Sequence, residues 1–276
     1  MTKENRINKI LTYFFLTIGA IIMLFPFYWM FSAAFKTLFE YNAFPPKLVP
    51  SNWLNFDNFK EVFRKADILK YFKNSFIVLI LEVGCSTITS IIGAYAYSRL
   101  RFRFRKLGYS LLLAFMMVPT EVMMITNYQT IVKLGIVNSL TALWLPWTTS
   151  VFYTTILKNF FDSVPDSLYY SAKVDGCSNW KYLWRVMVPI AKSSIFTVIL
   201  LNSITTFNAY LWTQLVIYSD DFRTIPLAIQ LMCTEFNTNP NLQLAVATLM
   251  VAPTTIIFIV CRKYIVGGVA RGGLKG

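Results

Sequence analysis

Histidine is absent from all 276 residues of this sequence. Without an imidazole, the chain has no His-based acid–base catalyst, no His metal ligand and no phosphohistidine relay. A G-x-x-x-x-G-K-[ST] run is also missing, so the chain carries no P-loop for ATP. We therefore expect no catalytic residue, no metal site and no cofactor, and any ATP hydrolysis that serves this protein must take place on another polypeptide.

Charged residues and cysteines are both scarce. Only 14% of the residues are Asp, Glu, Lys or Arg, whereas 56% are hydrophobic and 17% aromatic, which is too apolar for an ordinary soluble domain. The four cysteines, at positions 85, 177, 233 and 261, show neither C-x-x-C nor metal-ligand spacing. We expect them to be unpaired, small hydrophobic residues.

Long charge-poor runs take up most of the chain. Four runs lack Asp, Glu, Lys and Arg altogether, and two more contain a single carboxylate, Glu82 or Glu121. Each run reaches the roughly 20 residues that a helix needs to cross a hydrocarbon core, and in lipid a helix satisfies its own backbone groups. The sequence predicts an all-α, polytopic membrane protein with one transmembrane domain over 1–276 and six helices, at about 10–35, 72–98, 107–132, 136–158, 193–218 and 242–262.

The distribution of basic residues predicts the orientation of these helices. Seventeen Lys and Arg residues lie at 1–9, 99–106, 158–192 and 262–275, against nine on the other side. The positive-inside rule then places both termini in the cytoplasm and the chain in the cell membrane. The 26-residue first run exceeds a signal-peptide core, so we interpret it as a retained anchor. The net charge of +13 then fits anionic lipid head groups better than nucleic acid.

A polar segment at about 162–190 interrupts the apolar runs on the predicted cytoplasmic side. Pro165 favours the first turn of a helix, Gly176 can end that helix with a left-handed residue, and Ser178 or its neighbour can cap a second helix. Pro189 is expected to end the second helix. The segment is therefore predicted to form a bent helical hairpin between two membrane spans.

This segment resembles the cytoplasmic loop of ABC-importer permeases, whose pattern is E-A-A-x3-G-x9-I-x-L-P. Ala172, Gly176 and Pro189 match the pattern, valines replace its Ile and Leu, and Tyr170 stands where the family has Glu. Other segments resemble one subfamily, the maltose-permease G-type subunits of carbohydrate importers. These segments are P-F-Y-W-M-F-S-A-A-F-K at 26–36, G-A-Y-A-Y-S-R-L-R-F-R-F-R at 93–105, M-M-V-P-T-E-V at 116–122, F-N-A-Y-L-W at 207–212 and the terminal G-G-L-K-G.

The resemblance implies a transmembrane subunit of an ATP-driven carbohydrate importer that forms the sugar path together with a second, homologous permease. Two ATPase subunits and an extracytoplasmic solute-binding protein would be the other partners, besides the carbohydrate and membrane lipids. The hairpin would insert into a cleft of an ATPase and transmit its movement to the attached spans. The residues expected to couple to the ATPase are Tyr170, Ser171, Ala172, Asp175, Gly176 and Pro189.

Three residues are candidates for the substrate path. A carboxylate at the bilayer centre costs about 2.5–3.5 kcal/mol, so Glu121, beside the helix-breaking Pro119, is expected to face a water-filled path or the bundle interior. Asn208 and Trp212 are four residues apart and would share one helix face, offering an amide and an aromatic platform to a sugar. Packing between membrane helices is an equally good explanation of both, and pairing with a neighbouring hydroxyl or amide is the alternative for Glu121 and Glu82.

Other interpretations stay open at this point. A permease for glycerol phosphate or another small polar solute would share the same motifs. A secondary transporter would need its own coupling-ion site and internal repeats, and a non-transporting membrane scaffold would need no polar path. The extracytoplasmic segment at 36–73 could contact a solute-binding protein, but we favour a position flat on the membrane interface.

Overall fold

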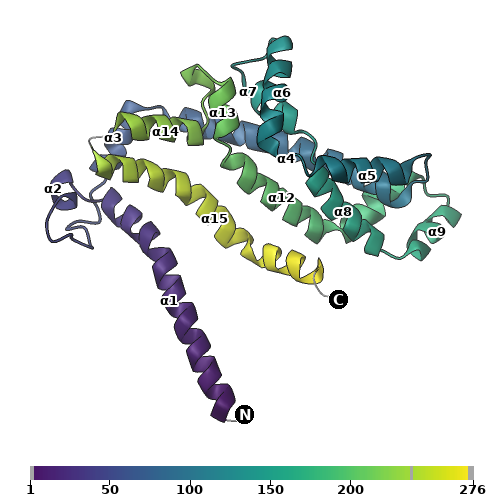
Figure 1. Ribbon diagram of the computed structural model, residues 1–276, viewed down its shortest axis with the longest axis horizontal. Helices are drawn as coiled ribbons and strands as arrows, with labels where there is room; N and C mark the ends of the chain where they lie inside the picture. The colour runs from purple at the N-terminus through teal and green to yellow at the C-terminus, as the bar shows by residue number, and fades with distance from the viewer. Residues whose placement is uncertain (1–2, 237–238, 273–276) are drawn as a thin grey trace. The chain divides into compact units, whose positions relative to one another are not determined.

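The computed structural model describes residues 3–236 and 239–272, and every element in these ranges is helical. The predicted all-α fold class is therefore confirmed. The terminal G-G-L-K-G motif lies outside the described residues from Gly273 onward. In chain order (Figure 1), the helices are α1 (Lys3–Ala34), α2 (Leu38–Tyr41), α3 (Asp57–Lys65), α4 (Ile68–Arg99), α5 (Arg105–Phe115), α6 (Thr120–Lys133), α7 (Leu140–Trp144), η1 (Leu145–Trp147), α8 (Val151–Ser163), α9 (Asp166–Val174), α10 (Asn179–Tyr182), η2 (Leu183–Met187), α11 (Val188–Ile190), α12 (Lys192–Phe207), α13 (Leu211–Val216), η3 (Asp220–Phe222), α14 (Ile225–Glu235) and α15 (Pro240–Gly272).

The helices differ in whether they are long enough to cross a membrane. By length and composition, α1 from Lys9 to Ala34 and α4 both qualify, and two further pairs qualify only if each pair is one bent span. In those pairs α5 and α6 meet at 99°, and the α10–α11 segment meets α12 at 79°. The six spans and their bounds therefore stay a prediction.

The chain divides into two compact units. The first unit contains the chain up to Ile68 together with Ala228–Pro253, and the second contains Leu69–Leu227 together with the chain from Thr254. In the first unit, an aromatic cluster joins the end of α1 to the segment before α3. The rings are 5.1 to 6.1 Å apart in this cluster, which consists of Phe31, Phe35, Trp53, Phe56 and Phe59.

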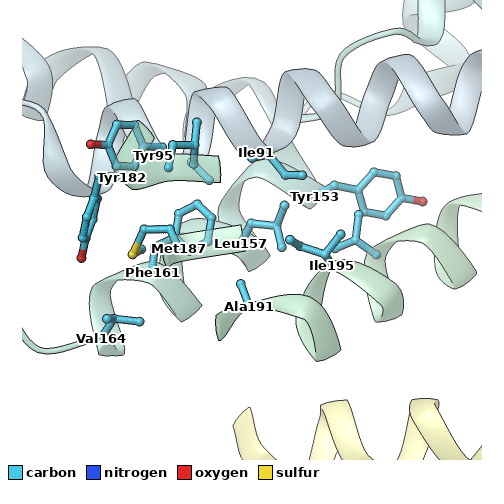
Figure 2. Close-up of a cluster of buried hydrophobic side chains, with 13 residues drawn as sticks. Ile91, Tyr95, Tyr153, Leu157, Phe161, Val164, Tyr182, Met187, Ala191 and Ile195 are labelled. Atoms are coloured by element: carbon cyan, nitrogen blue, oxygen red, sulfur yellow. The ribbon is translucent and has the colours of Figure 1, made fainter. Parts of the chain in front are cut away.

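The second unit has two hydrophobic cores. The larger core brings the C-terminal half of α4 together with α8, the hairpin helices and α12 (Figure 2). Its fully buried side chains include Leu157, Phe161, Tyr182 and Met187. The smaller core packs α13 against the ends of α6 and α7, around Trp212 and Leu143. The larger core therefore holds the polar segment at 162–190 against the apolar helices.

Candidate functional site: the hairpin at 162–190 and the helix ends that hold it

The segment at 162–190 forms the expected bent hairpin, and its turn has a defined geometry. Helix α9 ends at Val174, and Gly176 follows with a φ of +73°. The Cys177 N–H donates to the Ala172 carbonyl at 2.9 Å, and the Gly176 N–H donates to the Lys173 carbonyl at 3.1 Å. This pair of hydrogen bonds is the Schellman motif, which needs a left-handed residue that glycine adopts at least cost.

The second arm of the hairpin contains a π-helix that the sequence did not predict. Helix α10 begins after Ser178, whose side chain accepts a hydrogen bond from the Lys181 N–H. The chain then continues through the π-helix η2 and the short α11, which contains Pro189. The second arm ends at Ile190, one residue beyond the expected end at Pro189. The helix axis then turns by 79° between this arm and α12.

Arg99, at the last position of α4, attaches the hairpin to a membrane helix. Its side chain is only 5% exposed and forms an ion pair with Asp166 at the start of α9. The same guanidinium donates to the carbonyls of Phe161 and Val164 at the end of α8. One buried cation therefore connects α4, α8 and α9, which should move together.

Tyrosine rings complete this attachment. Tyr182 of α10 lies against Tyr95 of α4 and Tyr169 of α9, with ring centroids 6.3 and 5.2 Å apart. The Asn179 side-chain oxygen accepts hydrogen bonds from Tyr169 at 3.0 Å and Tyr95 at 3.4 Å. Tyr182 is fully buried inside the chain, so its ring is available neither to a partner protein nor to lipid head groups.

The residues expected to couple to an ATPase are partly on the surface. Tyr170 is 52% exposed, and its hydroxyl accepts a hydrogen bond from Arg101 at 3.3 Å. Ala172 is half-buried against the larger core. The other four residues are exposed: Ser171, Asp175, Gly176 and Pro189. The structure thus brings these residues onto one hairpin, and their role in coupling stays a prediction.

The three candidates for the substrate path do not lie together. Glu121 is exposed in the first turn of α6, directly after the break that Pro119 predicted. Asn208 caps the C-terminus of α12 and donates to the Ile204 carbonyl at 2.7 Å. Trp212 belongs to the next helix, α13, and its indole donates to the Ala142 carbonyl at 3.0 Å. The predicted common helix face of Asn208 and Trp212 is therefore wrong, because the chain leaves the helix between them.

Glu82 is buried in α4 and has a partner on another helix. The Thr206 hydroxyl of α12 donates to a Glu82 carboxylate oxygen at 2.7 Å. This contact matches the alternative in which an intramembrane acid pairs with a neighbouring hydroxyl. A buried carboxylate needs such a donor because burial without one is costly.

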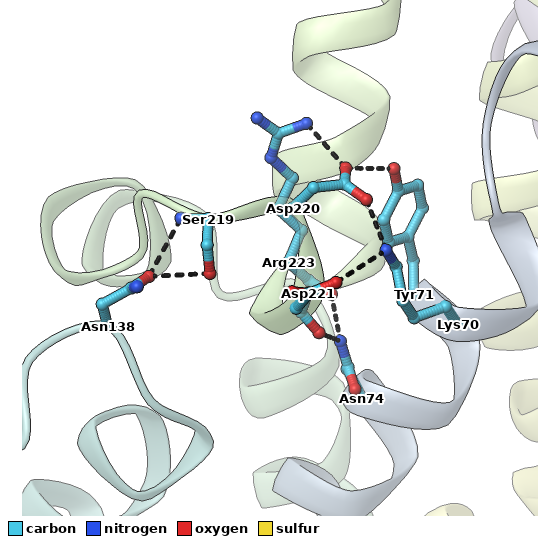
Figure 3. A network of polar contacts seen from close by, with 8 residues as sticks. All are labelled: Lys70, Tyr71, Asn74, Asn138, Ser219, Asp220, Asp221 and Arg223. Atoms are coloured by element: carbon cyan, nitrogen blue, oxygen red, sulfur yellow. Dashed lines mark hydrogen bonds and ion pairs between the residues drawn. The ribbon is translucent and has the colours of Figure 1, made fainter.

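A polar network that sequence reasoning missed joins the start of α4 to the segment around η3 (Figure 3). Lys70 forms ion pairs with Asp220 and Asp221, and the Tyr71 hydroxyl donates to Asp220 at 2.6 Å. Asn74 donates to the carbonyls of Asp221 and Arg223 at 2.8 and 2.9 Å. Burial alone would raise the pKa of Asp220, but hydrogen bonds from Lys70 and Tyr71 hold that pKa below its ordinary value. The adjacent aspartates were the only local signal of this network.

The described side chains offer no sign of a metal centre. Within them, no group of three or more Cys, Asp or Glu residues lies close enough together to hold a metal ion. Within the hairpin, Tyr169 donates to Asn179, and Arg99 of α4 donates to the Phe161 carbonyl of α8 beside it. These contacts can hold the hairpin in a fixed position against α4 and α8.

The model of the family described as "Binding-protein-dependent transport system inner membrane component" matches residues 87–271. This match covers α4 from its middle, the hairpin and α15. The chain belongs to this family of permeases. As a member it is a polytopic α-helical protein embedded in a membrane, and the permease subunit that the hairpin pattern indicated.

Several curated permeases are similar over nearly their whole length. The chain is 30% identical over 259 residues to the diacetylchitobiose uptake system permease protein of Streptomyces coelicolor, covering 92% of each chain. It is 29% identical over 268 residues to the arabinooligosaccharides transport system permease protein of Halalkalibacterium halodurans, covering 95% of this chain and 96% of that protein.

The fold of this permease is also similar to a solved structure. That structure is the crystal structure of a bacterial ABC transporter involved in the import of the acidic polysaccharide alginate. A chain of it aligns with a TM-score of 0.83 and 22% sequence identity, over 96% of this chain and 98% of that one. The similarity places the fold of this permease among those of ABC importers.

Proposed function

We propose that this permease is the transmembrane subunit of an ATP-driven carbohydrate importer and that the hairpin at 162–190 couples it to ATPase subunits. The observation that carries the coupling is the buried Arg99, which joins the hairpin to α4 and α8. The missing P-loop requires that ATP be hydrolysed on a separate subunit. The carbohydrate class is supported by relatives that carry diacetylchitobiose and arabinooligosaccharides.

The proposed transport cycle uses the hairpin as a rigid lever. ATP binding closes two ATPase subunits, and their movement displaces α9 and α10. Because Arg99 and the tyrosine contacts bind those helices to the ends of α4 and α8, the displacement tilts these helices as a body rather than bending the hairpin. A second permease tilts in the opposite sense, and the path between them opens outward to receive a sugar from a binding protein.

The orientation belongs to the same proposal. The seventeen-to-nine asymmetry of basic residues supports an orientation with both termini and the hairpin in the cytoplasm, on the side of the proposed ATPases. The polar network at Lys70 and Asp220 then lies on the opposite side. The relative from Brucella suis that transports sn-glycerol-3-phosphate is 25% identical over 280 residues, so a phosphorylated polyol is the second candidate substrate.

Purification and reconstitution test the proposal. The permease is expressed with its neighbouring transport genes, purified through a tag on this chain and reconstituted into proteoliposomes with each candidate binding protein. We expect ATPase subunits to co-purify, and labelled oligosaccharide to accumulate with ATP but not with a non-hydrolysable ATP analogue. Accumulation driven by a proton or sodium gradient without ATP would contradict the proposal, whereas uptake of sn-glycerol-3-phosphate alone would correct only the substrate class.

A further inference from the structure

The hairpin exposes a cluster of large apolar side chains that the rest of the second unit does not cover. Val174 at the end of α9 is 89% exposed, and Trp180 in α10 is 61% exposed. Tyr170, one helical turn before Val174 on the same side of α9, is also exposed, at 52%. We name Tyr170, Val174 and Trp180 the hairpin face. A surface of this kind next to a sharp turn is suited to filling a pocket on another protein.

The surroundings of the hairpin face are strongly basic. Residues 99–106 contain five Lys and Arg, and residues 166–190 contain three more, against only two Asp. One of these aspartates, Asp166, is already paired with Arg99. Asp175 is the only carboxylate in the two ranges outside such an ion pair, while Lys181 and Arg185 are exposed to solvent. The charge that a partner meets here is therefore positive.

Arg101 places one of these charges directly on the hairpin. Arg99 and Arg105 are bound within the chain, since Arg99 donates to carbonyls of α8 and Arg105 donates to the carbonyls of Leu100 and Ser98. Arg101 is instead exposed and reaches across to α9, where it donates to the Tyr170 hydroxyl at 3.3 Å. A guanidinium is thus hydrogen-bonded to the exposed side of α9, beside Tyr170.

We propose that the hairpin face docks into an apolar pocket of the ATPase whose rim carries a carboxylate opposite Arg101. The inference rests on the proposed function and adds the sign of the docking contact. A partner with a cation at that place would be repelled by Arg101, and the desolvation of two like charges would disfavour docking. A partner with an acidic rim would instead form a charge-assisted, bidentate pair with the guanidinium.

The anionic surface of the membrane is the other chemistry that could attract these charges. A lipid phosphate would bind Arg103 as readily as Arg101, because both lie in the connection between α4 and α5 and both are exposed. Arg101 is hydrogen-bonded to the hairpin, whereas the Arg103 guanidinium lies 4.8 Å from the Phe104 ring in the same connection. This difference favours the ATPase and makes Arg103 the matched control.

The test compares Arg101→Gln, Arg101→Glu and Arg103→Gln in the whole permease complex. Each variant is checked for normal membrane insertion. ATPase affinity is then measured across a salt series, first with delipidated complex in detergent and then in vesicles with anionic phospholipid. For Arg101→Gln we expect a loss of roughly tenfold in affinity at low salt, typical of a removed interfacial charge, and a difference from wild type that shrinks as salt screens the contact. Arg101→Glu should lose more, and Arg103→Gln should bind like wild type.

Other results would contradict either the acidic rim of the ATPase pocket or the proposed function itself. Arg101→Glu that binds the ATPase as tightly as wild type, or more tightly, would overturn the inference while leaving the proposed function intact. Equal losses in Arg101→Gln and Arg103→Gln that appear only in vesicles with anionic phospholipid would also overturn it, and would assign the charges to the membrane. A wild-type chain that recruits no ATPase at any salt concentration would instead contradict the proposed function itself.

Discussion

Single polar residues hold the first unit together where α1 ends. Lys36 is completely buried, its ammonium donates to the Lys47 carbonyl at 2.6 Å, and it lies 4.1 Å from the Trp29 ring. Burial lowers the pKa of Lys36, while the nearby Glu40 opposes that shift. Asn58 donates to the carbonyls of Ala34 and Lys36 at 2.8 Å. These bonds satisfy backbone groups that a buried helix end would otherwise leave unpaired.

Glu40 provides a pH-dependent contact in the same region. Its carboxylate accepts hydrogen bonds from the Ser51 and Thr37 N–H groups, both at 3.0 Å. A hydrogen bond from the Ser51 side chain, together with these N–H donors, lowers the pKa of Glu40 from 4.5 to about 2. Because the folded-state pKa is the lower one, the contact stabilises the fold above the ordinary Glu pKa, and this stabilisation is lost as the pH falls toward 2.

We predict that Glu40→Gln lowers the melting temperature of the purified permease at pH 6 and that its difference from wild type shrinks as the pH falls from 5 toward 2. The exposed pair of Lys60 and Asp57 offers a control, since Asp57→Asn should have little effect at any pH. A Glu40→Gln difference that is constant from pH 6 to pH 3 would show that the carboxylate charge is not involved.

At the scale of elements, the break between two apolar helices is where a charged side chain, Glu121, is found. The α5–α6 pair bends by 99° at Pro119, and Glu121 follows in the first turn of α6. A carboxylate there faces the positive end of the α6 dipole, which reduces the cost of placing the charge in the predicted membrane span. The sequence predicted this break from proline alone, because a proline inside an apolar run has no N–H to donate to the carbonyl four residues earlier and cannot continue the preceding helix.

We predict that Glu121→Gln leaves the assembled complex intact but changes the rate of solute uptake, because an exposed acid beside a break in a predicted membrane span is suited to a polar path. Uptake by proteoliposomes measures the effect, and Glu121→Leu should reduce it further. If both variants import at the wild-type rate, Glu121 has no role in the path.

The hairpin could be predicted from local sequence signals, whereas contacts between residues far apart in the chain could not be predicted. Pro165, Gly176 and Ser178 act on their own neighbours, so the start of α9, its Schellman end and the cap of α10 followed from the sequence. The attachment by Arg99 joins residues more than sixty positions apart, and no periodicity reports such a pair. The break between Asn208 and Trp212 has no Gly or Pro to mark it, which explains why one continuous helix was expected there.

At the scale of the whole molecule, the proposed coupling to ATPases requires that the hairpin lie on the cytoplasmic side of the membrane. We predict that a cysteine-free variant labels from outside the cell when a single cysteine replaces the exposed Leu54. A single cysteine in place of the exposed Ser178 should label only after permeabilisation. The expectation follows from the positive-inside asymmetry. The opposite labelling pattern would reverse the orientation and remove the hairpin from the ATPases.

In the proposed mechanism, the hairpin transmits ATPase movement to the membrane helices. Gly176 tests it because no described atom lies within 4 Å of a Cβ built there, so a substitution acts through the backbone, whose φ is +73°. A β-branched residue in this left-handed conformation costs about 1–2 kcal/mol and should re-aim the turn. Asparagine adopts the same conformation with less strain, which makes Gly176→Asn the control.

The most direct measurement is therefore the rate of ATP-driven solute uptake by proteoliposomes that contain the Gly176→Val complex, with ATPase association and substrate-stimulated ATP hydrolysis measured on the same sample. We expect both variants to insert normally into the membrane and Gly176→Asn to function nearly normally. Gly176→Val should lose ATPase association or substrate-stimulated hydrolysis, and therefore uptake. A Gly176→Val complex that binds its ATPases and imports solute at the wild-type rate would contradict the claim that this hairpin couples ATP hydrolysis to transport.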